Sequence, residues 1–131
     1  MFDLLLGAAL LFASFTVGST SALAQFAGPT PLTLINGWTN YSSGTSRAIA
    51  EEVTGIVQFR GAIATAGTTP VAFTLPASLR PLTNVYVPVD LCNATKRRLF
   101  IQPSGAVSVQ AETGFSNAQC FTSLDGASFV Q

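Results

Sequence analysis

Short runs in which apolar and polar residues alternate recur along the chain, and the clearest of them spans residues 55–76. Its inward positions are Val57, Phe59, Ile63, Val71, Phe73 and Leu75. A period of two is typical of strands with one buried face, and Gly61 stands where a bulky inward residue would otherwise fall. Turn-permissive residues occupy positions 66–69. The run therefore predicts a central antiparallel hairpin with both apolar faces on the same side, ended by Pro76.

Similar but shorter runs follow on both sides of this hairpin. We expect further strands at residues 32–34, 47–51, 84–91, 99–102, 106–111, 121–124 and 127–130. Turn signals separate several of them, notably Pro103-Ser104-Gly105 and Asp125-Gly126. Pro88 lies within the 84–91 run and indicates an edge strand, because proline has no N–H to donate to a ladder. Residues 112–119 are predicted to form a polar loop.

The pattern as a whole predicts an all-β fold: a small antiparallel β-sandwich or jelly-roll-like barrel of about eight short strands. We expect two packed sheets and no helix longer than about two turns after any targeting segment. The predicted core consists of Val57, Phe59, Ile63, Phe73, Leu75, Val87, Ile101 and Val107.

The N-terminus has the pattern of an export signal. Its apolar stretch, residues 4–17, is shorter than the ~18–20 residues that a membrane-spanning helix needs. Ala22-Leu23-Ala24 fits a cleavage site, although Asp3 stands where a basic residue is usual. We predict a signal peptide at 1–24, an extended lead-in at 25–31 and a β-sandwich domain at 32–131. The protein is then secreted or periplasmic with no stable membrane span; an uncleaved anchor is the alternative.

The composition of the chain limits the kinds of catalytic and metal sites that it could form. Charged residues make up 9% of the chain, the formal net charge is zero and histidine is absent. Without histidine there is no Ser–His or Cys–His nucleophile and no imidazole metal site, so we predict no enzymatic activity, no metal and no cofactor. Glu51 and Glu52 are adjacent, and in a strand they point to opposite faces instead of forming a catalytic pair. The basic cluster 96–98 would diverge in the same way, which argues against nucleic acid.

Cys92 and Cys120 are the only cysteines. Behind an export signal, a pair of cysteines favours a disulfide. The alternative, a reactive free thiol, lacks a histidine base and a strongly basic surround. We therefore predict a Cys92–Cys120 bridge between the end of the 84–91 strand and the start of the last segment.

Aromatic and polar side chains provide the candidate ligand-binding residues. Trp38, the only tryptophan, suits either a core anchor or a platform for stacking on a sugar, since both roles use a large apolar face. Tyr41 and Tyr86 are further stacking candidates. Asn40, Asp90 and Arg98 are the polar candidates for hydrogen bonds to a ligand.

An ordered set of motifs adds a resemblance that covers about residues 32–131. The motifs are Gly37-Trp38, Gly55-x-Val57-x-Phe59-x-Gly61-x-Ile63, Phe73-Thr74-Leu75-Pro76 with Arg80-Pro81, Leu99-x-Ile101-x-x-x-Gly105-x-Val107, and Thr122-Ser123-Leu124-Asp125-Gly126-x-Ser128-Phe129. The set resembles the C-terminal β-domain of phage tail-fibre, baseplate and receptor-binding proteins. The resemblance implies a small β-sandwich or barrel, often trimeric, that touches cell-surface saccharide. The export signal and the cysteine pair depart from the family pattern.

Two functions follow as expectations. The first is an exported, non-catalytic module, a homotrimer as the resemblance implies, that recognises a surface glycan or similar polymer. The alternative is a structural or assembly domain with no small ligand. A concave surface that bears Trp38, Tyr41 or Tyr86 beside a polar side chain would favour the first, and burial of all three would favour the second.

Overall fold

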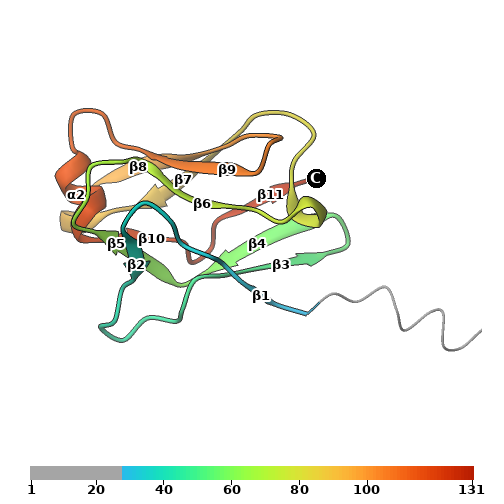
Figure 1. The fold of residues 1–131 in the computed structure, drawn as a ribbon, viewed down its shortest axis with the longest axis horizontal. Helices are drawn as coiled ribbons and strands as arrows, with labels where there is room; N and C mark the ends of the chain where they lie inside the picture. The colour runs from blue at the N-terminus through green and yellow to red at the C-terminus, as the bar shows by residue number, and fades with distance from the viewer. Residues whose placement is uncertain (1–27) are drawn as a thin grey trace, which may run out of the picture.

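A computed structural model describes residues 28–131. The predicted signal peptide and the first part of the lead-in lie outside the described residues. The described part is mostly β, with three small antiparallel sheets and one short α-helix, which confirms the predicted fold class (Figure 1).

Each sheet is short and antiparallel. The first has the order β1-β3-β4-β11, with β1 (Thr30–Pro31), β3 (Ile49–Val53), β4 (Ile56–Arg60) and β11 (Ser128–Val130). The second has the order β10-β5-β2, with β10 (Thr122–Ser123), β5 (Ala62–Thr65) and β2 (Trp38–Asn40). The third has the order β6-β9-β8-β7, with β6 (Val71–Thr74), β9 (Ala106–Gln110), β8 (Lys96–Ile101) and β7 (Val85–Asp90). The helices are η1 (Ala77–Leu79), η2 (Cys92–Ala94) and α2 (Phe115–Cys120).

The first and third sheets enclose the core between them (Figure 1). Phe59 on β4 packs against Phe73 on β6, with ring centroids 5.9 Å apart, and against Phe129 on β11 at 6.0 Å. Every residue predicted for the core is buried. The period-two pattern therefore identified the inward faces correctly, because burial of one face is what produces that pattern.

The predicted central hairpin is wrong in its pairing. Strand β4 pairs with β3 and β11, β5 pairs with β2 and β10, and β6 pairs with β9. The chain breaks at Gly61 and leaves the first sheet for the second, so residues 56–65 are not one strand. The turn-permissive residues 66–69 then lead into a third sheet instead of reversing the chain onto β5.

Gly61 allows this break because of its backbone conformation and its surroundings. Its φ is +101°, and a Cβ atom there would lie 2.5 Å from the carbonyl oxygen of Arg47. The turn at Asp125-Gly126 crosses between the same two sheets, since β10 belongs to the second and β11 to the first. We call this place, where both chain segments change sheet, the corner.

Hydrogen bonds join the two segments at the corner. The Asp125 carboxylate oxygen Oδ1 accepts from the backbone N–H of Gly61 at 2.8 Å. The Gly61 carbonyl accepts from the N–H of Leu124 at 2.8 Å, and the Ala127 carbonyl accepts from Phe59 at 2.9 Å. The predicted tight turn at 125–126 is present, but it connects two sheets and not two paired strands.

The third sheet agrees more closely with the predictions. Strands β8 and β9 form the hairpin expected around Pro103-Ser104-Gly105, with Ile101 opposite Val107. Strand β7 lies at the edge of its sheet, as Pro88 indicated. Along β7, Val87 and Val89 are buried, whereas Tyr86, Pro88 and Asp90 are exposed.

Other element predictions need correction. The structure has eleven strands in three sheets within residues 28–131, more than the predicted number, because the 55–65 run divides into β4 and β5 and two strands, β1 and β2, replace the one expected at 32–34. In the 32–34 run, Leu34 forms only an isolated bridge to Phe73, and the strand lies earlier, at β1. The predicted polar loop at 112–119 contains all but the last residue of α2.

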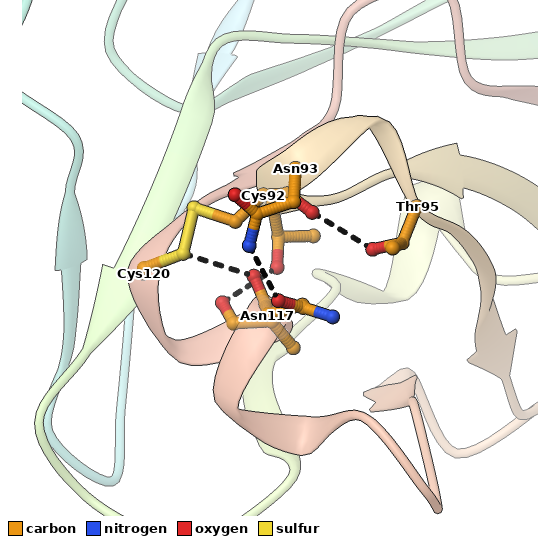
Figure 2. Close-up of a disulfide and its surroundings, with 7 residues drawn as sticks. Cys92, Asn93, Thr95, Asn117 and Cys120 are labelled. Carbon is orange, nitrogen blue, oxygen red and sulfur yellow. Dashed lines mark hydrogen bonds between the residues drawn. A yellow bond between two sulfur atoms is a disulfide. The ribbon is translucent and has the colours of Figure 1, made fainter.

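The predicted disulfide between Cys92 and Cys120 is present, with the two Cα atoms 6.1 Å apart (Figure 2). It connects η2, which follows β7, to the last residue of α2. Asn93 donates from Nδ2 to the side-chain oxygen of Asn117 at 3.0 Å beside the bridge. The bridge and this hydrogen bond help to hold a six-residue helix that has no side-chain cap at its N-terminus.

Candidate binding surface

The outward face of the third sheet gathers aromatic and polar side chains from three strands. Tyr86 on β7 lies opposite Phe100 on β8, and Pro88 lies opposite Arg98. On the other side of β8, Arg98 lies opposite Gln110 of β9. Because cross-strand partners share a face, these side chains lie next to one another on the outside of the sheet.

Four of these residues, Tyr86, Arg98, Phe100 and Gln110, form what we call the aromatic platform. The rings of Tyr86 and Phe100 stack with centroids 5.0 Å apart and an interplanar angle of 11°. The guanidinium carbon of Arg98 lies 4.6 Å from the centre of the Tyr86 ring. The Arg98 Nε donates to the Gln110 side-chain oxygen at 2.7 Å. Tyr86 is 52% exposed, so the platform presents an aromatic side chain, a cation and an amide at the surface.

A shallow cavity of about 420 Å³ adjoins the platform. It is lined by Arg97, Arg98, Gln110, Glu112 and Thr113. The basic residues were predicted to diverge, yet Arg97 and Arg98 line the same cavity. Arg97 does lie on the opposite face of β8 from Arg98, as the alternation predicts. It precedes the buried part of the strand, however, and its exposed side chain reaches toward Gly114.

The predicted site residues separate into two groups, and Trp38 is in neither. Trp38 is only 3% exposed, its ring meets Phe115 edge-on at 6.3 Å, and its Nε1 donates to the Thr69 carbonyl at 2.9 Å. This is the core-anchor interpretation of Trp38. Its indole presents no open face on which a sugar could stack, which corrects its assignment as a ligand-binding residue.

The first group, Asn40 and Tyr41, lies at the second sheet. The side-chain oxygen of Asn40 accepts from the N–H of Ala48 at 2.7 Å and thereby holds the loop that follows β2. Tyr41 is half-buried and meets the Phe121 ring edge-on at 5.0 Å. These contacts are structural, and they place both side chains on a different sheet from Tyr86.

The second group, Tyr86, Asp90 and Arg98, shares the outward face of the third sheet. Asp90 lies two pleats along β7 from Tyr86, opposite Lys96. Sequence reasoning missed Phe100 and Gln110, which complete the platform. The signal was present: Phe100 lies two residues from Arg98, so both occupy one face of a strand. The cross-strand register that brings Tyr86 and Gln110 to them is not visible from one strand alone.

A second cavity lies at the corner and has a volume of about 450 Å³. We call it the corner groove. Its polar lining consists of Glu51, Gln58, Arg60, Asp125 and Ser128. Glu52 lies outside it and accepts from the N–H of Gly55 at 2.6 Å, so the two adjacent glutamates have separate surroundings, as predicted.

Two negative findings concern the part of the chain that the structure describes. Between residues 28 and 131, no three side chains of the metal-ligating types cluster closely enough to hold an ion. No helix within that range has the length and apolarity to cross a bilayer.

Comparison with known proteins identifies a structural relative. No family model matches the chain, and no curated protein sequence matches it. Among solved structures, the receptor binding protein gp15 of Listeria phage PSA has a similar fold, with a TM-score of 0.65 at 18% sequence identity. The match covers 94% of this chain and 77% of the phage protein. The similarity confirms the fold that the motif resemblance implied.

Proposed function

We propose that this protein is an exported, non-catalytic binding module that recognises a surface saccharide or a similar exposed polymer. The observation that supports the proposal most directly is the fold similarity, over 94% of the chain, to a phage protein named for receptor binding. The phage protein and this chain share 18% identity, so the ligand has to be argued from the side chains of this chain.

The aromatic platform is the binding surface that we assign to this function. Its stacked rings offer exposed aromatic surface, and Arg98 and Gln110 offer donors and an acceptor beside them. A pyranose ring has one apolar face and a perimeter of hydroxyl groups, so it complements such a surface. Arg98 is held by both Tyr86 and Gln110, which lowers the entropy that it loses when a ligand binds.

Trimer formation belongs to the same proposal. One stacking contact and a few hydrogen bonds at an open surface give weak binding, with Kd on the order of 1 mM. Linking several copies raises the effective concentration at each later contact, so a homotrimer would bind a repetitive polymer far more strongly than one chain. Export would bring the module to the place where such polymers occur.

A structural or assembly role remains the second candidate, and a specific observation favours it. Trp38 is buried and Tyr41 is half-buried against Phe121, so two of the three aromatic candidates serve the fold. Tyr86 is the most exposed of the three. The two functions therefore differ in what they require of Tyr86.

A glycan array and a whole-cell binding assay, both on the chain as secreted by an expression host, test the proposal. We expect binding to at least one surface glycan, weakened about tenfold by Tyr86→Ala through loss of the stacking face and its cation partner. Tyr86→Phe keeps the ring and should retain most of the binding. Leu82→Ala is the matched control, because Leu82 is 86% exposed and lies in a loop outside the platform.

Two results would decide against the binding role. Absence of binding to glycans and cell envelopes at about 1 mM would put the structural role ahead. Equal binding by Tyr86→Ala and the unsubstituted protein would remove the platform as the site. Light scattering measures the assembly directly, and a monomeric mass would contradict the trimer.

A further inference from the structure

The corner groove is unrelated to the platform and has its own polar lining. Its residues come from three neighbouring strands of the first sheet and from the turn after β10. Glu51 lies opposite Gln58, and Gln58 lies opposite Ser128, so these three outward side chains form one row across β3, β4 and β11. Arg60 lies one pleat further along β4, and Asp125 lies on the turn at the corner.

The hydrogen bonds of the corner hold the Asp125 side of this lining in place before any ligand arrives. Asp125 Oδ1 is occupied by the Gly61 N–H, which fixes the carboxylate. Leu124 and Ala127, on either side of the turn, are bonded through their backbones to Gly61 and Phe59. A pocket whose polar groups are already positioned loses less entropy on binding than one formed by loose side chains.

The kinds of side chain in the groove select the ligand class. Two carboxylates accept hydrogen bonds, the Arg60 guanidinium donates, the Gln58 amide does both, and the Ser128 hydroxyl does both. An apolar ligand would remove water from these charged groups without replacing their hydrogen bonds. The carboxylates of Glu51 and Asp125 would repel an anion, and the guanidinium of Arg60 would repel a cation. A ligand with many neutral hydroxyl groups satisfies both kinds of partner.

We propose that the corner groove binds a neutral saccharide unit, as a second site distinct from the aromatic platform. A volume of about 450 Å³ lies within the range of small-molecule pockets. The proposal deepens the proposed function and rests on it only for the natural source of the sugar, a surface polymer. The groove itself is argued from the residues of the first sheet.

The placement of the two sites has a consequence for binding. The first and third sheets face each other through Phe59 and Phe73, so their outer surfaces point in opposite directions (Figure 1). One chain can therefore hold polymer on two sides at once. Even a monomer would then bind a dense polymer layer more strongly than either site alone, through effective concentration.

Nuclear magnetic resonance titration of the secreted chain tests the groove. The probes are maltose, cellobiose and N,N′-diacetylchitobiose, with glucuronate and glucosamine as charged comparisons. At least one neutral disaccharide should shift the backbone amide signals of residues 58–61 and 125–128. Gln58→Ala should weaken that binding by about tenfold, the loss expected when a side chain that hydrogen-bonds the ligand is removed. Gln102→Ala is the matched control, since Gln102 lies at the β8–β9 turn outside both sites.

The outcomes separate this proposal from the proposed function. Groove shifts that persist in Tyr86→Ala and disappear in Gln58→Ala support the second site, whether or not the platform binds its polymer. Absence of groove shifts with every neutral sugar at about 50 mM would overturn it. Stronger binding of glucuronate or glucosamine than of the neutral disaccharides would overturn the ligand class. Polymer binding that depends on Tyr86 alone would leave the proposed function intact without the groove.

Discussion

The third sheet and the corner are built by different means. In the β7-β8-β9 part of the sheet, neighbouring strands follow one another along the chain, and the β8–β9 turn is local. At the corner, Gly61 and Asp125 are 64 residues apart, and the contact between them decides where two strands stop and change sheet. The difference shows that alternation and turn residues determine a local sheet, whereas a change of sheet depends on a tertiary contact.

The largest expected effect comes from breaking the corner. Gly61→Ala places a Cβ atom 2.5 Å from the Arg47 carbonyl oxygen at a φ of +101°. The combined cost of the left-handed conformation and the clash should lower the free energy of unfolding by about 4 kcal/mol. Urea denaturation measures it. Gly126→Ala is the matched control, because Gly126 has a φ of +80° with no atom within 4 Å, and it should cost only about 1 kcal/mol. Equal losses would show that packing at Gly61 is unimportant.

Removal of the disulfide should have the next largest effect, because the bridge connects the end of β7 to the helix before β10. Its sequence separation is 28 residues, so the variant with both Cys92→Ser and Cys120→Ser should lose about 3 to 4 kcal/mol on the chain-entropy model. Hydrogen exchange should then quicken first in α2, while the β8–β9 hairpin stays protected. The fluorescence of Trp38 reports the same event, since Trp38 packs on Phe115 of α2. Loss of protection in β8 before α2 would contradict this order.

A smaller effect is expected on the outer face of the third sheet. Phe100→Ala removes the stacking partner of Tyr86 from a half-buried position and should lower the free energy of unfolding by about 1 kcal/mol. Thermal unfolding measures the change. Leu82→Ala, at an 86% exposed residue, should be close to neutral. A decrease of more than about 3 kcal/mol in the free energy of unfolding would mean that Phe100 belongs to the core and not to the solvent-facing side of the sheet.

The sequence predictions were accurate for the locally connected third sheet and less accurate at the corner. Pro88 indicated an edge strand and Pro103-Ser104-Gly105 indicated a hairpin because both signals act within a few residues. Phe59 and Ile63 were correctly predicted as buried, but their alternation continues across Gly61 although the strand does not. No pattern in the sequence around Gly61 indicates that Arg47 and Asp125 contact it in the fold. The pairing of β4, β5 and β6 could not be predicted for that reason.

Sequence reasoning could predict the candidate site only for residues whose shared face follows from their spacing along a single strand. Tyr86 and Asp90 share a face of β7 by spacing alone. Phe100 and Gln110 join them through cross-strand register, and Trp38 leaves the list because its ring is buried against Phe115. The helix α2 escaped prediction because six residues with little helix signal of their own are held by a disulfide and tertiary contacts.

The prolines in two outer strands determine how copies of this protein can sit side by side. Pro31 lies in β1 and Pro88 in β7, each the outermost strand of its sheet, and neither residue can donate to a strand from another molecule. Residues 34 and 35 already bond to β6 at the opposite edge of the third sheet. Crowded copies therefore have little opportunity to extend the first sheet through β1, or the third sheet through either of its edges, into fibrils.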